Sequence, residues 1–208
     1  MKNNMTAITG TYRTWDIFNE LTPDEVCSRV DVTFNEDTGQ YSIISFGQTM
    51  SVDKERRRVF SDTEEGRSLL RYTDYFFDLS ILWYLIGAQK IPLSGKLVKP
   101  SELEGGQIFV KGTHVLPLDA IAAKYNGKGD FLFQKSSLFG AKKLPMGDVA
   151  VEFRAFPKIP ITIILWFGDE EFPPEAQLLL DSTCTSHIST DVLWSVATVT
   201  CLMLLDKH

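Results

Sequence analysis

Residues 148–205 read DVAVEFRAFPKIPITIILWFGDEEFPPEAQLLLDSTCTSHISTDVLWSVATVTCLMLL, and this stretch decides the fold. Apolar and polar side chains alternate over residues 149–154, which is typical of a half-buried strand. Residues 161–167 are apolar at every position except Thr162, as expected of a strand that is covered on both faces. A further apolar run at residues 176–180 follows an acidic turn, so the two runs predict an antiparallel pair of strands.

The polar segment 182–191 separates these strands from the last apolar run. Its Ser, Thr and Asp side chains are those that accept hydrogen bonds from the free N–H groups of a first helical turn. We therefore predict a loop here, followed by a helix from about Thr190 to Leu205. Apolar residues cover most of the circumference of this helix, which indicates that it is largely buried.

Strand patterns also occupy the N-terminal part of the chain. A β-hairpin is predicted within residues 32–46, because a turn that reads NEDTG lies between two apolar runs. Further short strands are predicted at residues 49–52 and 58–61. These strands and those of residues 148–180 could share one antiparallel sheet.

Helical patterns lie between the two groups of strands. Apolar side chains recur at helical spacing over residues 63–88, and Gly87 ends the run. A further helix is predicted over residues 113–125. Together the patterns predict an α+β fold with a mostly antiparallel sheet and helices packed on one side. We expect a disordered tail at residues 1–10 and a single α+β domain over residues 11–208.

The composition is that of an ordinary globular protein. Hydrophobic residues make up 44% and charged residues 23% of the 208 positions, which provides enough apolar material for a solid core. The formal net charge is −6 at pH 7, whereas a nucleic-acid-binding surface needs a basic field. We therefore expect no nucleic-acid partner.

Neither the N-terminus nor any apolar run predicts export or membrane insertion. The first ten residues lack the apolar core of a signal peptide. The longest apolar runs are shorter than the roughly 18 residues that a membrane-spanning helix needs. Cys27, Cys184 and Cys201 are widely spaced and odd in number, which argues against a disulfide framework. We therefore expect a cytoplasmic protein with no membrane partner.

His114 is the first candidate functional residue. It lies at the start of the helix that is predicted to end at Tyr125, and a helix N-terminus disfavours the imidazolium form. A neutral imidazole at this position could ligate haem iron, cobalt or zinc. The alternative is a histidine that caps the helix or forms hydrogen bonds within the fold.

Cys184 and His187 form a Cys-x-x-His pair. Both side-chain types ligate zinc and iron, but two ligands make only half a site. His114 would supply a third ligand if the loops converge, so His114, Cys184 and His187 are the candidate metal ligands. The alternative is a loop thiol beside a surface histidine.

Aromatic residues make up 12% of the chain, which suits either a solid core or an aromatic-lined pocket. We name His114, Trp83 and Trp166 as the candidate cofactor-binding residues. Trp15 and Trp194 could line the same pocket. For each tryptophan, the alternative is a place in the hydrophobic core.

Other polar groups give weaker patterns. The acidic run Asp169–Glu171 offers oxygen ligands to hard cations but lacks the spacing of a calcium loop, and its alternative is a solvated turn. Asp181 and the two hydroxyl residues that follow it could position a phosphate or a sugar, or could cap the following helix. No Gly-x-Ser-x-Gly elbow occurs, and spacing does not show that Cys184 and His114 meet. We name no catalytic residue.

Three segments stand out, and two of them each carry a compact motif. The segments read FDLSILWYLIGAQKIPLSGKLVKPSELEGG at 77–106, GQIFVKGTHVLPLDAIAAKYNG at 106–127 and FPKIPITIILWFGDEEFPPEAQLLLDS at 156–182. The motifs are GxHxLP at residues 112–117 and GDEEFP at residues 168–173. In these motifs the chain resembles an uncharacterised domain family of anaerobic bacteria and archaea, over residues 20–205.

Some members of that family are fused to a small iron–sulfur module with four cysteines, which the three cysteines of this chain cannot supply. The resemblance implies a place near iron–sulfur, corrinoid or other tetrapyrrole metabolism. It implies no reaction, because neither the metabolic context of a family nor its fold identifies the chemistry of a particular site.

The sequence thus supports more than one function. The first is a soluble, non-catalytic binding module for a metal-containing cofactor, namely a tetrapyrrole such as haem or cobalamin, with His114 as the axial ligand. The second is an accessory protein that binds no small molecule and contacts an iron–sulfur or corrinoid methyl-transfer partner through its acidic loop. The third is a small hydrolase or transferase that uses Cys184 or Asp181.

Overall fold

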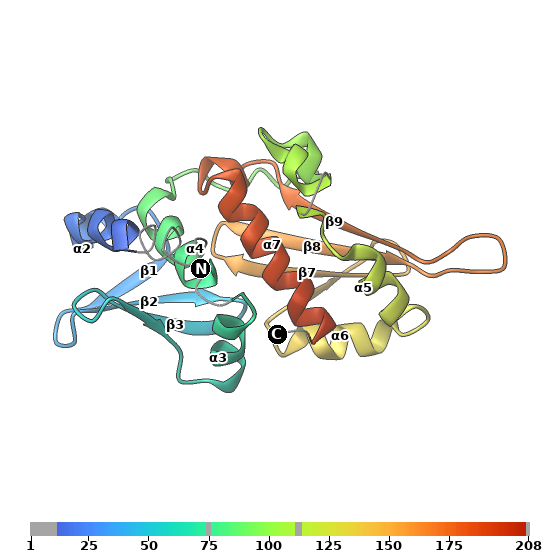
Figure 1. The fold of residues 1–208 in the computed structure, drawn as a ribbon, viewed down its shortest axis with the longest axis horizontal. Coiled ribbons are helices and arrows are strands. Elements are labelled where there is room, and N and C mark those ends of the chain that lie inside the picture. Colours follow the sequence, from blue (N-terminus) through green and yellow to red (C-terminus); the bar gives the residue numbers. More distant parts are fainter. Residues whose placement is uncertain (1–11, 74–75, 111–113, 207–208) are drawn as a thin grey trace, which may run out of the picture.

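The computed structural model describes residues 12–73, 76–110 and 114–206, so the tail expected at residues 1–10 lies outside the described residues. Within the described ranges the strands form two antiparallel sheets (Figure 1). The N-terminal sheet has the order β1-β2-β3-β4, with strands β1 (Val32–Asn35), β2 (Gln40–Ser45), β3 (Gln48–Asp53) and β4 (Arg58–Phe60). The C-terminal sheet has the order β5-β9-β8-β7-β6, with strands β5 (Leu97–Val98), β6 (Lys142–Leu144), β7 (Val149–Phe156), β8 (Ile159–Trp166) and β9 (Glu175–Asp181).

The helices lie before, between and after these strands. A first helix covers residues 12–20. The others are α2 (Pro23–Cys27), α3 (Glu64–Arg71), α4 (Phe76–Gly87), α5 (Leu118–Tyr125), α6 (Gly129–Ser137) and α7 (Thr190–Leu205). Short 3₁₀ helices are η1 (Pro100–Glu102), η2 (Gly106–Val110) and η4 (Cys184–Ser186). The described part of the chain contains no helix that is both long enough and apolar enough to cross a membrane.

The expectation of one shared sheet is wrong, and a tight turn explains why. Ser45 pairs with Gln48, so β2 reverses into β3 over two residues. Both of these residues, Phe46 and Gly47, have positive φ angles of 47° and 70°, as in the two-residue turns that suit the twist of a hairpin. The strand therefore turns back where it meets the other sheet, instead of continuing into it.

The two sheets meet at a corner. The hydroxyl of Ser45 donates to the carbonyl of Ala155 at 2.6 Å, and the N–H of Phe46 donates to the carbonyl of Arg154 at 2.8 Å. The register of β7 against β8 shifts between Arg154 and Phe156, which marks a bulge at this point. The corner therefore forms where β7 is already irregular.

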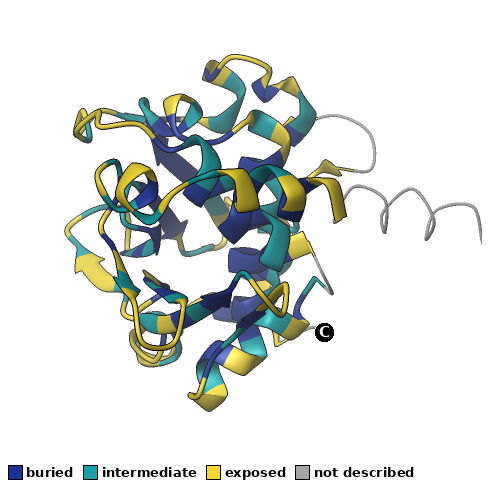
Figure 2. Ribbon diagram, turned by 90° about the vertical axis from the view of Figure 1, so that its left-hand side faces the viewer, coloured by how far each residue is buried: buried dark blue, intermediate teal, exposed yellow. Residues whose placement is uncertain are grey.

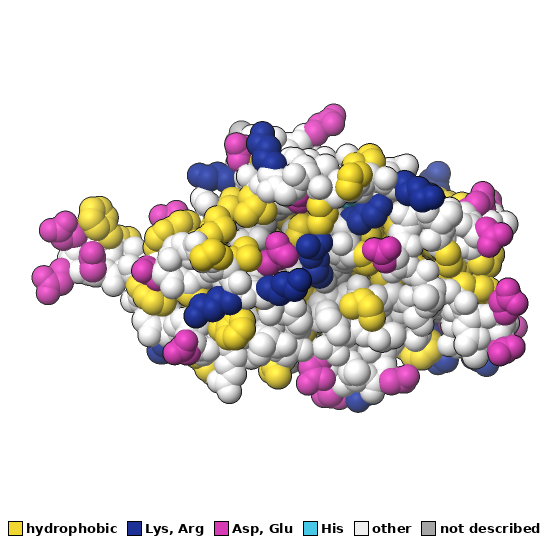
Figure 3. All heavy atoms as spheres, turned by 180° about the vertical axis from the view of Figure 1, so that it is seen from behind, with side chains coloured by type: hydrophobic (Ala, Val, Ile, Leu, Met, Phe, Trp, Pro, Cys, Tyr) yellow, Lys and Arg dark blue, Asp and Glu magenta, His cyan; other side chains and the backbone are white. Residues whose placement is uncertain are grey.

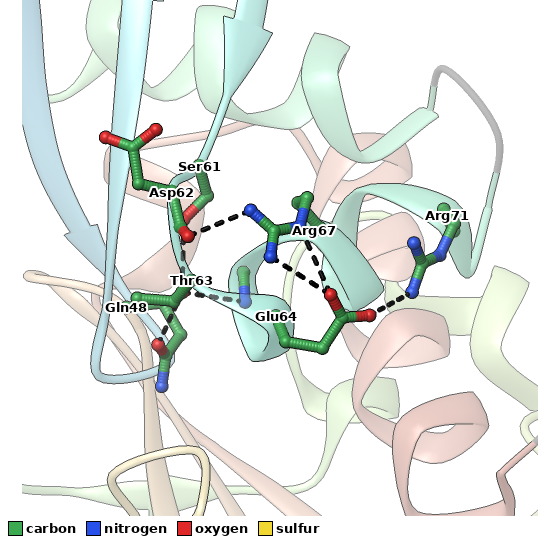
Figure 4. A network of polar contacts seen from close by, with 8 residues as sticks. Gln48, Ser61, Asp62, Thr63, Glu64, Arg67 and Arg71 are labelled. Atoms are coloured by element: carbon green, nitrogen blue, oxygen red, sulfur yellow. Dashed lines mark hydrogen bonds and ion pairs between the residues drawn. The ribbon is translucent and has the colours of Figure 1, made fainter.

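The helix predicted over residues 63–88 is in fact two helices, α3 and α4. The two bury different surfaces, because α3 packs on β3 and β4 whereas α4 packs on α7. One straight helix could not reach both. The hydroxyl of Thr63, the N-cap of α3, accepts from the N–H of Gly66 and donates to Gln48 of β3, which ties the start of the helix to that strand (Figure 4). Within the helix, Glu64 forms ion pairs with Arg67 and Arg71.

The prediction of helices on one side of the sheet is confirmed for the C-terminal sheet. Helices α5, α6 and α7 lie over one face of it, and α4 packs beside α7 near the corner between the sheets (Figure 1). Buried residues are concentrated on these strands and helices, where they pack against one another (Figure 2). At the corner, Phe77 and Tyr84 of α4 stack on Phe156, with ring centroids 6.1 and 4.7 Å apart. The fold class is therefore α+β, as the sequence predicts.

Helix α5 begins later than the sequence predicts. The expected start was residue 113, which lies outside the described residues, whereas the helix begins at Leu118. Pro117 stands immediately before the helix, and a proline disfavours the helical conformation of the residue that precedes it. The segment that carries His114 is therefore not the first turn of α5.

Candidate functional site

A cavity of about 470 Å³ opens between α4 and α7. We call it the aromatic pocket. Its walls come mainly from one face of each helix, together with the segment that precedes α5. The residues that line it include Phe76, Leu79 and Trp83 of α4, Trp194 and Thr198 of α7, and His114.

Two contacts fix His114 against α7. The indole N–H of Trp194 donates to the backbone carbonyl of His114 at 2.6 Å. The two rings also meet edge to face, with centroids 4.7 Å apart and an interplanar angle of 72°. His114 thus lines the aromatic pocket beside a tryptophan. The helix that was expected to favour a neutral ring does not begin there, so that argument for a neutral His114 fails.

The three candidate cofactor-binding residues are not all in one place. Trp83 lines the aromatic pocket together with His114. Trp166 lies at the end of β8, where it pairs with Glu175, is 38% exposed and does not line the pocket. The structure therefore brings His114 and Trp83 together and places Trp166 elsewhere.

The sequence contained a signal that groups Trp83 and Trp194, which we had named, with the pocket residues that our prediction missed. Residues 76, 79, 80 and 83 of α4 line the pocket, and so do residues 191, 194, 195 and 198 of α7. Both sets have the spacing i, i+3, i+4, i+7, which places side chains on one face of a helix. Each helix is apolar on nearly all sides, however, so no single face stood out in the sequence.

A second cavity, of about 560 Å³, lies at the start of α7. We call it the α7-start cavity. Thr185, Ser186 and His187 line it from η4 and its C-cap, and Ser189 lines it as the N-cap of α7. Trp83, Asp191 and Val192 line both this cavity and the aromatic pocket, so the two adjoin.

His187 is almost completely buried, with 1% of its surface exposed. The backbone N–H of Gln89 donates to its Nδ1 at 3.3 Å. Burial lowers the pKa of the imidazole, and the nearby ammonium group of Lys158 lowers it further. His187 is therefore neutral at pH 7, with Nδ1 as an acceptor and the proton on Nε2.

Cys184 is a buried thiol. Burial raises its pKa to about 12, with a further contribution from the carboxylate of Asp181. Thiolates, not thiols, ligate metals and attack electrophiles, so this environment disfavours both roles. A hydrolase or transferase function that uses Cys184 therefore gains no support.

The structure does not bring the three candidate metal ligands together. His114 lines the aromatic pocket, His187 lines the α7-start cavity, and Cys184 is buried in η4. Among residues 12–73, 76–110 and 114–206, no three His, Cys, Asp or Glu side chains are placed so that they could share a metal ion.

Comparison with known proteins places the chain in a family. No curated protein and no solved structure matches the chain. The family model described as a domain of unknown function (DUF3786) matches residues 22–203, which is most of the 208 residues. The resemblance to a domain family of unknown function is thereby confirmed, and the chain belongs to the DUF3786 family.

Proposed function

We propose that the protein is a cytoplasmic, non-catalytic binding module for a tetrapyrrole, haem or a corrinoid such as cobalamin, in anaerobic metabolism. The observation that supports this function is the aromatic pocket, which His114 lines together with Trp83 and Trp194. Its volume of about 470 Å³ lies within the range of roughly 300–1,000 Å³ that is usual for pockets that bind small molecules.

The residues present fit such a ligand. Haem is a flat, largely apolar ring that carries its own metal with four ring nitrogens, so the protein needs to add only apolar walls and an axial ligand. Phe76, Trp83 and Trp194 provide aromatic surface. His114 provides an imidazole, which can bind a metal through one nitrogen while the other nitrogen donates a hydrogen bond.

An anaerobic titration with haem and with cobalamin, followed by visible absorption, tests the proposal. We expect a saturable spectral shift near one equivalent for one of the two. His114→Ala should weaken binding by about tenfold or more, since the axial ligand is lost. Trp83→Leu should also weaken binding, because it removes an aromatic wall of the pocket.

Trp166→Leu is the matched control, because it removes a tryptophan that lies outside the aromatic pocket. Its affinity should equal that of the unmodified protein. The absence of any spectral shift with either cofactor would reject the proposed function. Full affinity in His114→Ala would reject His114 as the ligand, and a loss in Trp166→Leu equal to that in Trp83→Leu would reject the pocket as the binding site.

A specific observation also favours the accessory function. The β8–β9 loop, residues 167–174, projects from the end of the C-terminal sheet (Figure 1) and carries acidic and hydrophobic side chains (Figure 3). Its Phe172 is 67% exposed. The carboxylate of Asp169 accepts from the N–H groups of Glu171 and Phe172, both at 2.8 Å, so the tip has a defined shape. An exposed phenyl ring among carboxylates suits an apolar site with a basic rim on an iron–sulfur or corrinoid protein.

Changing the tip of this loop should weaken any complex that depends on it. In a pull-down from an anaerobic host, the Glu170→Lys/Glu171→Lys variant should retain less partner, and the loss should grow as salt is lowered because like charges are then less screened. Phe172→Ala should reduce retention at all salt concentrations. The control is Glu36→Lys/Asp37→Lys in the β1–β2 turn, an acidic turn elsewhere on the surface. Equal retention by all of these variants would reject the loop as the contact.

A further inference from the structure

The outer edge of β9 is only partly covered by β5. Strand β5 pairs with the last two residues of β9, and Val98 lies opposite Leu180. Two residues further along the same register, Pro100 would stand opposite Leu178. A proline has no N–H to donate to a neighbouring strand, and the chain turns into η1 at this residue instead. Within the described part of the chain, no strand therefore lies beside the outer edge of β9 before Leu180.

The backbone groups of Leu178 and Ala176 face this open edge. Successive residues of a strand direct their N–H and C=O groups to opposite sides. The N–H of Ser182 donates to the carbonyl of Lys96 at 2.9 Å, which lies on the β5 side of β9. Counting back in steps of two residues, Leu178 and Ala176 face that side as well. Among the residues that the structure describes, no hydrogen bond ends on these edge-facing groups.

A groove of about 370 Å³ runs along the same edge, and we call it the β9 groove. Four consecutive residues of β9, Glu175–Leu178, line it. Consecutive side chains of a strand point to opposite faces of the sheet, so a cavity that touches all four residues opens along the strand edge. The exposed side chains of Val110 and Val115 also line the groove. A free backbone edge and apolar surface thus lie together.

We propose that the β9 groove binds an extended peptide segment of another protein, which adds a strand antiparallel to β9 and in line with β5. Two N–H donors and two carbonyl acceptors at alternate residues are matched by the backbone of such a segment. The inference goes beyond the proposed functions, because it requires no tetrapyrrole and does not use the tip of the β8–β9 loop.

The register determines where the peptide should be apolar. Neighbouring side chains on paired strands lie on the same face of the sheet. Leu178 belongs to the main core and Ala176 packs against it, whereas Leu179 belongs to the cluster on the other face. The peptide side chains opposite Leu178 and Ala176 therefore point to the side of the main core, and we expect both to be apolar.

The charges at the groove determine the direction of the peptide. Glu175 is exposed at the start of β9, and Asp119 lines the same groove. Lys99 follows β5, so it lines the end of the groove away from Glu175. An antiparallel segment ends beside Glu175, where a basic residue would form a cross-strand ion pair. The expected pattern is apolar, any residue, apolar, basic.

The peptide acetyl-TVTVKT-amide, which carries this pattern, is the probe for isothermal titration calorimetry. We expect saturable binding at one equivalent. N-methylation of either valine should weaken binding by about fivefold or more, because the valine N–H groups face β9. The matched control is N-methylation of the threonine between them, whose N–H faces away from β9, and it should retain the affinity of the unmodified peptide.

Two protein variants test the site from the other side. Ala176→Pro removes an N–H that faces the groove and takes no part in the pairing with β8, so it should weaken binding by about fivefold. Glu175→Lys should weaken binding of acetyl-TVTVKT-amide by about threefold and strengthen binding of acetyl-TVTVET-amide by a similar factor. Damage to the fold would not reverse the preference between the two peptides.

Three results would overturn the inference: no saturable binding of acetyl-TVTVKT-amide, equal losses from methylation of threonine and valine, or an unchanged charge preference in Glu175→Lys. Sedimentation of the unmodified protein and of Ala176→Pro tests a different occupant. A monomer in both cases supports a peptide of another protein. A dimer that Ala176→Pro converts to a monomer would show that β9 of a second copy fills the groove, which would also overturn the inference.

Discussion

Replacing Gly47 by alanine should destabilise the protein by about 2–5 kcal/mol, because the new methyl group adds backbone strain of about 1–2 kcal/mol to overpacking of about 1–3 kcal/mol. Gly47 has a φ of 70°, a conformation that costs energy for any residue with a Cβ. A Cβ there would lie 2.9 Å from the Cα of Gly140 and 3.1 Å from its nitrogen. Backbone atoms cannot move aside as the end of a flexible side chain can, so the segments 46–48 and 139–141 would have to separate.

Gly39→Ala is the matched control, since it carries the strain without the contact. Gly39 has a φ of 65°, and nothing lies within 4 Å of the position that its Cβ would occupy. The Gly39→Ala variant should lose only about 1–2 kcal/mol of its free energy of unfolding. Urea denaturation of both variants gives the two free energies of unfolding. Equal losses would show that the approach of Gly47 to Gly140 does not contribute to stability.

This close approach also shows what the sequence could not reveal. The alternation over residues 149–154, the apolar run before the acidic loop and the apolar run that ends at Leu205 each depend on local pattern, and the structure contains β7, β8 and α7 at those places. The corner between the sheets depends on a turn in which Phe46 adopts a positive φ. Asn or Asp is the usual residue there, so the pattern did not indicate a two-residue hairpin.

The candidate site was predictable in its residue types but not in its grouping. The sequence pointed to His114 and Trp83, and the structure places both at the aromatic pocket. It did not show that Trp166 lies elsewhere. The alternation of a strand predicts the face of the sheet on which a side chain lies, but not how far that side chain is from the pocket. Nor could the spacing of Cys184 and His187 show that one is a buried thiol and the other a histidine already bonded to Gln89. The burial of a side chain and its hydrogen-bond partners depend on contacts between segments far apart in the chain.

Asp181 connects the end of β9 to the segment that leads into the α7-start cavity. The residue is 2% exposed. It accepts from the N–H and hydroxyl groups of Ser94 and Thr183 and from the N–H of Gly95, at distances between 2.6 and 3.2 Å. Burial alone would raise the pKa of Asp181, but the hydrogen bonds from Thr183 and Ser94 outweigh it and lower the pKa to about 2. A carboxylate with this many donors is a structural group, which supports neither sugar binding nor catalysis at this residue.

Asp181→Asn should therefore lose about 2–4 kcal/mol of stability at pH 7, because an amide has only one acceptor oxygen and its NH₂ group would face donors. The pH dependence has a definite sign. The folded-state pKa of about 2 is below the ordinary value of 3.8, so the ionised group stabilises the fold above about pH 4. That contribution, about 2 kcal/mol, is lost as the pH falls from about 4 to about 2.

Urea denaturation between pH 2.5 and pH 7 measures both effects. The stability of the unmodified protein should decline more steeply below pH 4 than that of Asp181→Asn, which has no carboxylate to protonate at this position. Asp169→Asn is the control, because Asp169 also accepts backbone N–H groups but lies exposed in the β8–β9 loop, and its loss at pH 7 should be much smaller. Parallel pH profiles for Asp181→Asn and the unmodified protein would contradict the assignment. They would show that the hydrogen bonds of Asp181 do not couple its ionisation to folding, and that another contact fixes the Ser94–Lys96 segment to the end of β9.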